Sequence, residues 1–81
     1  MSEKLKQDIS IGHNLKSLRK RANLSQEAVA AKLELQGFSM SQKIISQMEL
    51  GHYSIRISVL LALKQIYNVA SFDEFFKDLE K

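Results

Sequence analysis

The apolar positions of the chain recur with helical spacing in five separate segments. In the first segment, Ile11, Leu15 and Leu18 follow one another at intervals of four and three residues, which places them on one face of a helix. The later segments carry similar apolar stripes and no internal repeat. The pattern therefore predicts an all-α protein, a compact five-helix bundle, with helices over residues 10–22, 25–35, 41–50, 57–67 and 72–80.

Short polar residues and glycines mark where these helices start and stop. Ser25 and Ser71 stand where the second and fifth helices need an N-cap. For the third helix, Ser39 forms a capping box with Gln42, and Ser41 is the alternative cap. The residues that tolerate the left-handed conformation of a helix end are Asn23, Gly51 and Asn68.

The length of 81 residues favours one domain. We expect residues 1–9 to be a flexible, polar N-terminus and residues 10–81 to form the folded domain. The chain has no Cys, so disulfides and Cys-based zinc sites are excluded. No apolar run approaches the roughly 20 residues that cross a bilayer, and the start lacks the apolar stretch of a secretory signal. These features predict a cytoplasmic protein without a membrane partner.

The charge is unevenly distributed along the chain, although the formal net charge is only +3. Residues 1–22 hold six Lys or Arg against two acidic residues, whereas residues 71–81 hold two against four. This asymmetry suggests that one face of the protein, near the basic N-terminal segment, meets a polyanion. The acidic C-terminal segment would then lie on another face, away from that polyanion.

Features of an enzyme are missing from the sequence. The two histidines, His13 and His52, are 39 residues apart, and no metal-binding or Gly-rich phosphate motif is present. A chain this short also leaves little room for a substrate cleft. We therefore expect no enzyme, no cofactor, no metal site and no small-molecule substrate.

Two linked motifs give the chain a more specific signature. Residues 23–30 read NLSQEAVA, and residues 45–51 read ISQMELG. In this order, and with Leu15, Leu18 and Arg19 upstream, they resemble the phage-repressor and Cro-like (XRE) helix-turn-helix family. The resemblance covers about three quarters of the chain. It implies a lambda-repressor-like DNA-binding domain, and a regulator that binds double-stranded DNA, as a repressor dimer on a palindromic operator.

The third predicted helix is where the resemblance places base reading. Ile45 and Met48 form its inner stripe, and short polar side chains lie outside. Gln can bond adenine in a bidentate manner, and Lys can donate to guanine. The alternative is an ordinary solvated helix face. The base-reading candidates are Gln42, Lys43, Ser46 and Gln47.

The resemblance also implies phosphate contacts at the start of the second helix and in the loop after the third helix. Free N–H groups and small polar side chains at an N-terminus suit a phosphate. Within the loop, Arg56 is the best candidate, whereas His52 and Tyr53 are equally compatible with loop residues that have no partner. The phosphate-contacting candidates are Ser25, Gln26, Ser41, Tyr53 and Arg56.

An ion pair between Arg19 and Glu49 is also implied by the resemblance, in a structural role. If this pair is partly buried, breaking one half should cost more than the ~0–1 kcal/mol of a surface pair.

The connector between the second and third helices departs from the family pattern. Residues 34–40 make it about five residues longer than the usual tight turn. We expect Leu35, Phe38 and Met40 to fold back onto the core and hold the third helix in place. Ile44, at a typically outward position, either touches a thymine methyl or covers this connector.

The last predicted helix carries an apolar stripe that consists mainly of aromatic residues. We hypothesise that residues 71–81 hold a homodimer; the alternative is that they close the core of the monomer. The dimer candidates are Phe72, Phe75, Phe76 and Leu79. For the protein as a whole, the alternative to DNA binding is an adaptor or antitoxin-like interaction module that keeps the fold without its own DNA site.

Overall fold

The fold is built from four α-helices within the part of the chain that the structure describes. The computed structural model describes residues 4–5, 10–52 and 54–79. The elements in order are β1 (Lys4–Leu5), α1 (Gly12–Arg21), α2 (Gln26–Leu35), α3 (Gln42–Glu49), β2 (Ile55–Arg56), α4 (Ile57–Ile66) and a 3-10 helix, η1 (Phe72–Phe76). The all-α class is confirmed, whereas the prediction of five α-helices is wrong.

Serine side chains cap the N-termini of α2 and α3. The Ser25 hydroxyl accepts a hydrogen bond from the Ala28 N–H, and the Ser41 hydroxyl accepts one from the Ile44 N–H. Ser41, and not Ser39, is thus the cap of α3. A left-handed residue follows each of the four α-helices. These residues are Asn23 (φ of 60°), Gly37 (93°), Gly51 (80°) and Asn68 (54°).

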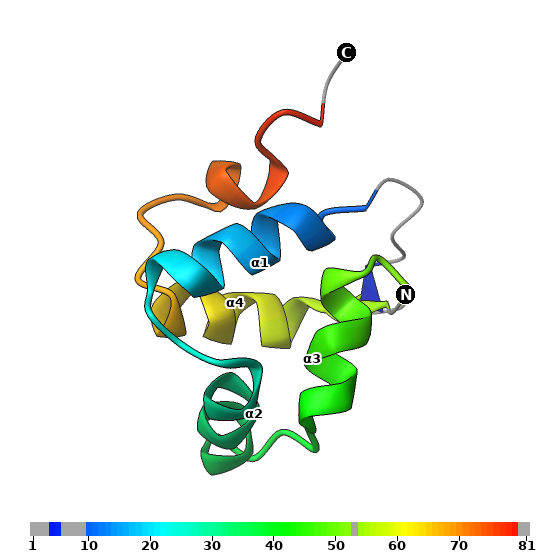
Figure 1. The fold of residues 1–81 in the computed structure, drawn as a ribbon, viewed down its shortest axis with the longest axis vertical. Helices are drawn as coiled ribbons and strands as arrows, with labels where there is room; N and C mark the ends of the chain where they lie inside the picture. The colour runs from blue at the N-terminus through cyan, green and yellow to red at the C-terminus, as the bar shows by residue number, and fades with distance from the viewer. Residues whose placement is uncertain (1–3, 6–9, 53, 80–81) are drawn as a thin grey trace.

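The helices enclose one hydrophobic core to which every α-helix contributes. α3 packs against both α1 and α2, and η1 packs on α1 at the end of the molecule opposite α2 (Figure 1). Burial of these side chains is the main term that stabilises so small a domain. The side chains with the lowest exposure are Leu15, Val29, Leu33, Ile45, Ile55, Leu63 and Phe75.

The predicted fifth helix is a short 3-10 helix followed by extended backbone. Ser71 caps it as expected, through a hydrogen bond from the Asp73 N–H. The side-chain amide of Asn14 on α1 then donates to the carbonyls of Phe75 (3.0 Å) and Lys77 (2.8 Å). These carbonyls are bound from α1, and Asp78 adopts a φ of 64°, so the helix ends at Phe76 and does not continue over residues 77–79.

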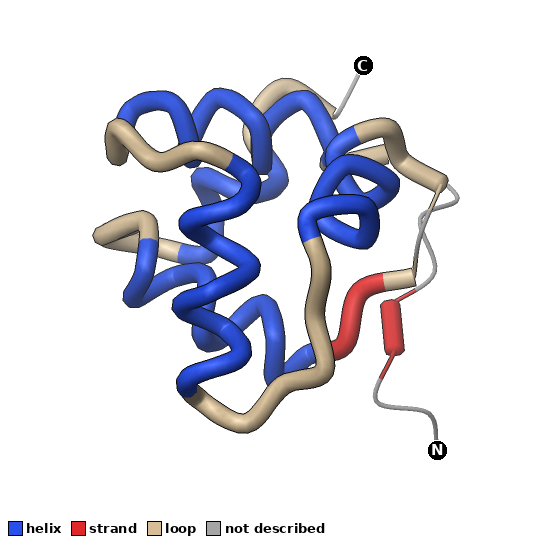
Figure 2. Tube along the Cα trace, turned by 60° about the horizontal axis from the view of Figure 1, so that its bottom comes forward, coloured by secondary structure: helices blue, strands red, loops and turns tan. Residues whose placement is uncertain are grey.

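The N-terminal residues contain a strand that the sequence pattern did not predict. Lys4–Leu5 pairs antiparallel with Ile55–Arg56, with Lys4 opposite Arg56 and Leu5 opposite Ile55 (Figure 2). Residues 1–9 were expected to be a flexible N-terminus without a regular element, and this strand is an addition to that expectation. The other residues of this range lie outside the described ranges.

The connector between α2 and α3 folds back only in part. Phe38 and Met40 pack against the core as expected. Leu35, the last residue of α2, is 88% exposed, so the prediction that it returns to the core is wrong. The backbone turns at Gly37, whose φ is 93°.

Among the described residues, no helix is both long and apolar enough to cross a membrane.

Candidate nucleic-acid interface

Helix α3 has an apolar inner face and a polar outer face. Ile45 and Met48 are 1% and 2% exposed, which is the inner stripe expected from the sequence. Gln42 and Lys43 are exposed at the first turn, and Ser46 and Gln47 are partly exposed one turn later. All four base-reading candidates thus keep accessible surface on one short helix.

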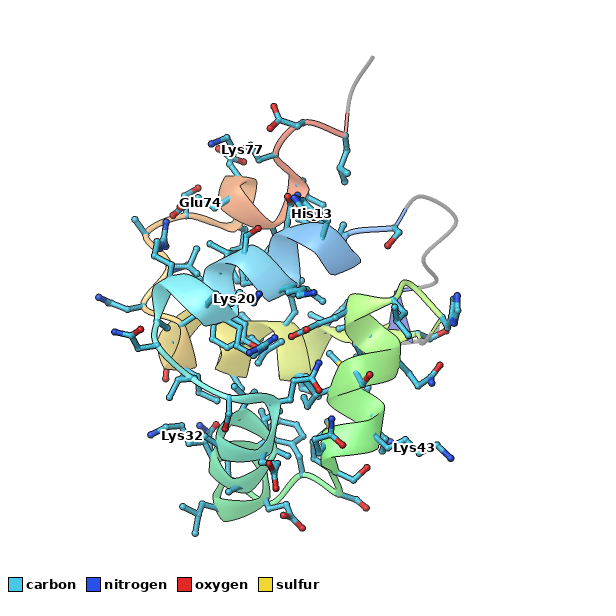
Figure 3. The ribbon with its side chains drawn as sticks, viewed as in Figure 1. His13, Lys20, Lys32, Lys43, Glu74 and Lys77 are labelled. Atoms are coloured by element: carbon cyan, nitrogen blue, oxygen red, sulfur yellow. The ribbon has the colours of Figure 1, made fainter. Side chains whose placement is uncertain are left out.

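The outer residues of α3 divide between two adjacent faces. Gln42, Ser46 and Glu49 are spaced four and three residues apart, so they share the face toward the start of α2. Lys43 and Gln47 share the neighbouring face, and the Lys43 side chain points away from α2 (Figure 3). A ligand lying along α3 can therefore meet an amide face and a face with a cation at the same time.

A bidentate ion pair joins α1 to the end of α3. Arg19 Nε donates to Glu49 Oε2 at 2.6 Å, and a terminal Arg19 nitrogen donates to Glu49 Oε1 at 3.1 Å. The other terminal nitrogen donates to the Leu24 carbonyl at 2.9 Å. The hydrogen bond to Glu49 raises the pKa of Arg19. Because the two side chains are only 9% and 4% exposed, water screens this expected pair weakly.

The Gln26 side chain links this ion pair to the first residue of α3 through two hydrogen bonds. Its Nε2 donates to Glu49 Oε1 at 3.0 Å, and its Oε1 accepts a hydrogen bond from Gln42 Nε2. Gln26 was expected to contact a phosphate; the contacts seen in the free protein are with two side chains of α3. The sequence motifs carry no signal for this link, which depends on how α2 and α3 pack.

The hydrogen-bond chain fixes which way the Gln42 amide faces. An ionised carboxylate only accepts hydrogen bonds, so Gln26 must turn its NH₂ group toward Glu49 and its oxygen toward Gln42. The Gln42 amide then donates one N–H to the Gln26 oxygen. Its carbonyl oxygen and second N–H are left as an acceptor and a donor for a ligand.

Helices α2 and α3 begin close together, because Gln26 and Gln42 are their first residues and are hydrogen-bonded. Two positive ends of helix dipoles therefore flank one surface. Ser25 and Ser41 are exposed there, each with its hydroxyl engaged as a cap. Arg56, also exposed, lies in β2, and the fifth phosphate candidate, Tyr53, lies outside the described residues.

The acidic tail lies away from α2 and α3, as its sequence position suggested. Glu74 and Lys77 are at the opposite end of the molecule from both helices (Figure 3). Arg21 donates to Glu74 at 2.8 Å, and this hydrogen bond lowers the pKa of Glu74. Within the described part of the chain, no group of three His, Asp or Glu side chains is placed to hold a metal.

The four dimer candidates have different environments. Phe75 is 0% exposed and belongs to the core, so the hypothesis that it faces a partner is wrong. Phe72 and Leu79 are half-buried against the core, and Phe76 is 44% exposed. The alternative that this segment closes the monomer core holds for Phe75.

Comparison with known families assigns the chain to one of them. Residues 15–75 match the family described as helix-turn-helix, of the Cro/C1 type, and this match spans more than half of the chain. No curated protein and no solved structure matches the chain. The matched region contains α1 from Leu15 onward, the whole of α2 and α3, and the Arg19–Glu49 pair described above. The chain therefore belongs to the Cro/C1-type (XRE) family of helix-turn-helix DNA-binding transcription regulators.

Proposed function

We propose that the protein is a sequence-specific repressor that binds a palindromic operator as a dimer and reads bases with α3. The observation that carries this proposal is the chain of hydrogen bonds from Arg19 through Glu49 and Gln26 to Gln42. It holds one exposed amide in a defined orientation, as base recognition requires and as an ordinary solvated helix face does not.

Gln42 is the residue assigned to an adenine. Its remaining N–H donates to adenine N7 and its oxygen accepts from the adenine amino group, the bidentate pattern of the major groove. Lys43 donates to guanine O6 and N7, and Ser46 and Gln47 contact base edges one turn further along. A good bidentate pair discriminates by about 1–3 kcal/mol. Ile44 is half-buried against the core, so we assign it to covering the connector.

Phosphates on either side of the groove are bound by the helix N-termini and the loop after α3. Ser25, Gln26 and Ser41 stand where the N–H groups of α2 and α3 meet the backbone of the duplex. Tyr53 and Arg56 contact the next phosphates along the strand. These contacts position the protein, and their electrostatic part weakens as salt rises.

Dimerisation places two copies of α3 in successive major grooves, so a palindromic operator matches the symmetry of the protein. The exposed apolar residues available for a dimer include Phe76 in η1 and the pair Ile57 and Leu61 on one face of α4. Repression then needs only occupancy of the operator.

The base-reading assignment is tested by selecting duplexes from a random pool. The variant Gln42→Ala/Lys43→Ala/Gln47→Ala should lose the enriched sequence while keeping its helical circular dichroism spectrum. The matched control is Gln65→Ala/Lys77→Ala, which changes exposed residues away from α3. Enrichment of the same site by the triple variant would contradict base reading by α3.

The dimer is tested by sedimentation of the free protein and of its complex with the selected duplex. The variants Phe76→Asp and Leu61→Asp each add a charge to one exposed apolar site. One of them should make the free protein sediment as a monomer, whereas the wild type should sediment as a dimer. A wild-type complex with a single protomer on a site without symmetry would contradict the dimer.

A further inference from the structure

Glu49 lies too far along α3 to touch the base that is assigned to Gln42. The two residues are the last and the first of this helix, and their separation of seven positions corresponds to roughly 10 Å of axial rise. The side chain of Glu49 is also only 4% exposed, so little of it is accessible to a duplex. Any effect of Glu49 on the choice of a base must therefore pass through other side chains.

One side chain of α2 provides such a path. Gln26 Nε2 donates to Glu49 Oε1 at 3.0 Å, and Gln42 Nε2 donates to Gln26 Oε1. The carboxylate also accepts two hydrogen bonds from Arg19, at 2.6 and 3.1 Å. These contacts are all donations to Glu49, as an ionised carboxylate requires.

The direction of each hydrogen bond in this path follows from the one before it. Because Gln26 turns its NH₂ group to the carboxylate, only its oxygen faces Gln42, and Gln42 must answer with an N–H. A ligand then meets the Gln42 oxygen beside one N–H. If the Gln26 amide were reversed, Gln42 would give its oxygen to Gln26 and present two N–H groups to the ligand.

The two orientations of the Gln42 amide fit different purines. In the major groove, adenine presents an acceptor and a donor, N7 and the amino group, whereas guanine presents two acceptors, N7 and O6. The observed orientation matches adenine, and it would place the Gln42 oxygen against guanine O6, where neither atom can donate. The reversed orientation matches guanine. The choice between the purines therefore depends on which end of the Gln26 amide faces Gln42.

We propose that Glu49 determines base specificity: acting through Gln26, its buried carboxylate makes α3 select adenine over guanine at the base pair that Gln42 reads. Glu49 is a positioning residue, because it contacts no base itself. This role is separate from the ion pair with Arg19, which joins α1 to α3 whichever way the Gln26 amide turns. The inference rests on the proposed function, since it requires that Gln42 meets a purine.

The free protein gives the first test, without any duplex. In the ¹⁵N-labelled chain, the side-chain amide protons of Gln26 should exchange with water at least about tenfold more slowly than those of Gln65, because a hydrogen bond must open first. Gln65 is an exposed glutamine on α4. Equal exchange of the two amides would overturn the proposal, because the carboxylate would then not hold Gln26.

The choice of base is measured with two duplexes that differ only at the pair assigned to Gln42, A·T in one and G·C in the other. That pair is identified as the one whose replacement no longer matters in Gln42→Ala. The wild type should prefer adenine by about 5- to 150-fold, the range of a good bidentate contact. A wild-type preference for another base at this pair would overturn the proposal while leaving base reading by α3 in place.

Glu49→Gln removes the group that can only accept hydrogen bonds. The new amide can offer Gln26 either an oxygen or an N–H, so both orientations of Gln26 find a partner. The preference for adenine should consequently fall at least about fivefold, toward equal binding of the two duplexes. A preference equal to that of the wild type would overturn the proposal.

Further variants separate positioning from a general loss of structure. Gln26→Met breaks the path but keeps the ion pair, so it should lower the preference as Glu49→Gln does; any lost phosphate contact weakens both duplexes and cancels in the ratio. Leu63→Ala removes buried side-chain volume from α4, and it should keep the wild-type preference at a temperature where every variant is folded. An equal loss of preference in Leu63→Ala would overturn the role of Glu49.

The Gln42→Ala background shows whether Glu49 acts through Gln42. In that background Glu49→Gln should not change the ratio of the two affinities any further, because the two residues act along one path. A further change would overturn the assignment. A wild type that selects no sequence would instead contradict the proposed function, and with it the inference, whereas an adenine site that Glu49→Gln reads equally well contradicts the inference alone.

Discussion

Replacing Arg19 by methionine removes the guanidinium that joins α1 to α3 and keeps much of its aliphatic length. The carboxylate of Glu49 then stays behind with a side chain that is 4% exposed. It retains the hydrogen bond from Gln26 at 3.0 Å, and the Leu24 carbonyl loses its bond from the guanidinium. The variant therefore leaves a buried charge that only a neutral amide still binds.

The loss in free energy of unfolding follows from the burial of this charge. Breaking a buried ion pair by removing one partner costs about 3–5 kcal/mol. Because Glu49 keeps the hydrogen bond from Gln26, we expect a loss of about 3 kcal/mol, at the lower end of this range. A domain of 81 residues has a free energy of unfolding of about 4–12 kcal/mol. The Tm should consequently fall by roughly 12–24 °C, at about 4–8 °C per kcal/mol.

The matched control is Arg21→Met, on the same helix. Its ion pair with Glu74 has side chains that are 54% and 32% exposed, so this variant should lose no more than about 1 kcal/mol. Urea unfolding followed by circular dichroism measures both. The double variant Arg19→Met/Glu49→Met should be more stable than Arg19→Met alone, because no charge remains buried. A difference below about 1 kcal/mol between Arg19→Met and Arg21→Met would refute the reasoning.

Three further predictions concern local structure. Gly12→Ala should cost about 1–3 kcal/mol in thermal unfolding, because its Cβ would lie 2.1 Å from the Glu49 carbonyl oxygen, and an unchanged Tm would contradict this close approach. Ser41→Ala should cost about 0.5–2 kcal/mol through the lost cap of α3, and Ser41→Asn should recover most of it; equal losses in both would argue against capping. The pKa of Glu74 is lowered by Arg21, so its contribution to stability is present above its unfolded pKa and is lost as pH falls through its folded pKa. Glu74→Gln should therefore narrow the stability gap between pH 7 and pH 3 in urea titrations, and a gap as wide as in the wild type would contradict that sign.

The start of α2 was predictable from the sequence, because a serine at the N-cap satisfies N–H groups within its own turn. For α3 the sequence offered two caps, Ser39 and Ser41, and the structure shows that Ser41 is the cap. The inner stripe of α3 follows from helical periodicity in the same way. The Arg19–Glu49 pair was accessible only through the resemblance to a family, since 30 residues separate its partners.

The parts that sequence patterns missed depend on contacts between distant residues. The last segment has the apolar spacing of an α-helix, yet Asn14 of α1 binds its carbonyls and leaves a 3-10 helix. The link between Gln26 and Gln42 exists only because α2 and α3 begin side by side. Leu35 matches the apolar pattern of α2 but lies beyond the core, because the chain turns outward at the end of this helix.

Specific reading of DNA by α3 is the central claim, and a ratio of two affinities tests it most directly. The measurement is the Kd for the selected duplex against the Kd for a duplex of the same composition in scrambled order, at one fixed salt concentration. We predict a ratio of at least about 10³ for the wild type. Gln42→Ala should lower this ratio about 5- to 150-fold, which corresponds to about 1–3 kcal/mol, with the loss confined to one base pair in each half-site. A wild-type ratio near one, with affinity for both duplexes falling steeply as salt rises, would show only a basic surface on phosphates and would contradict the account.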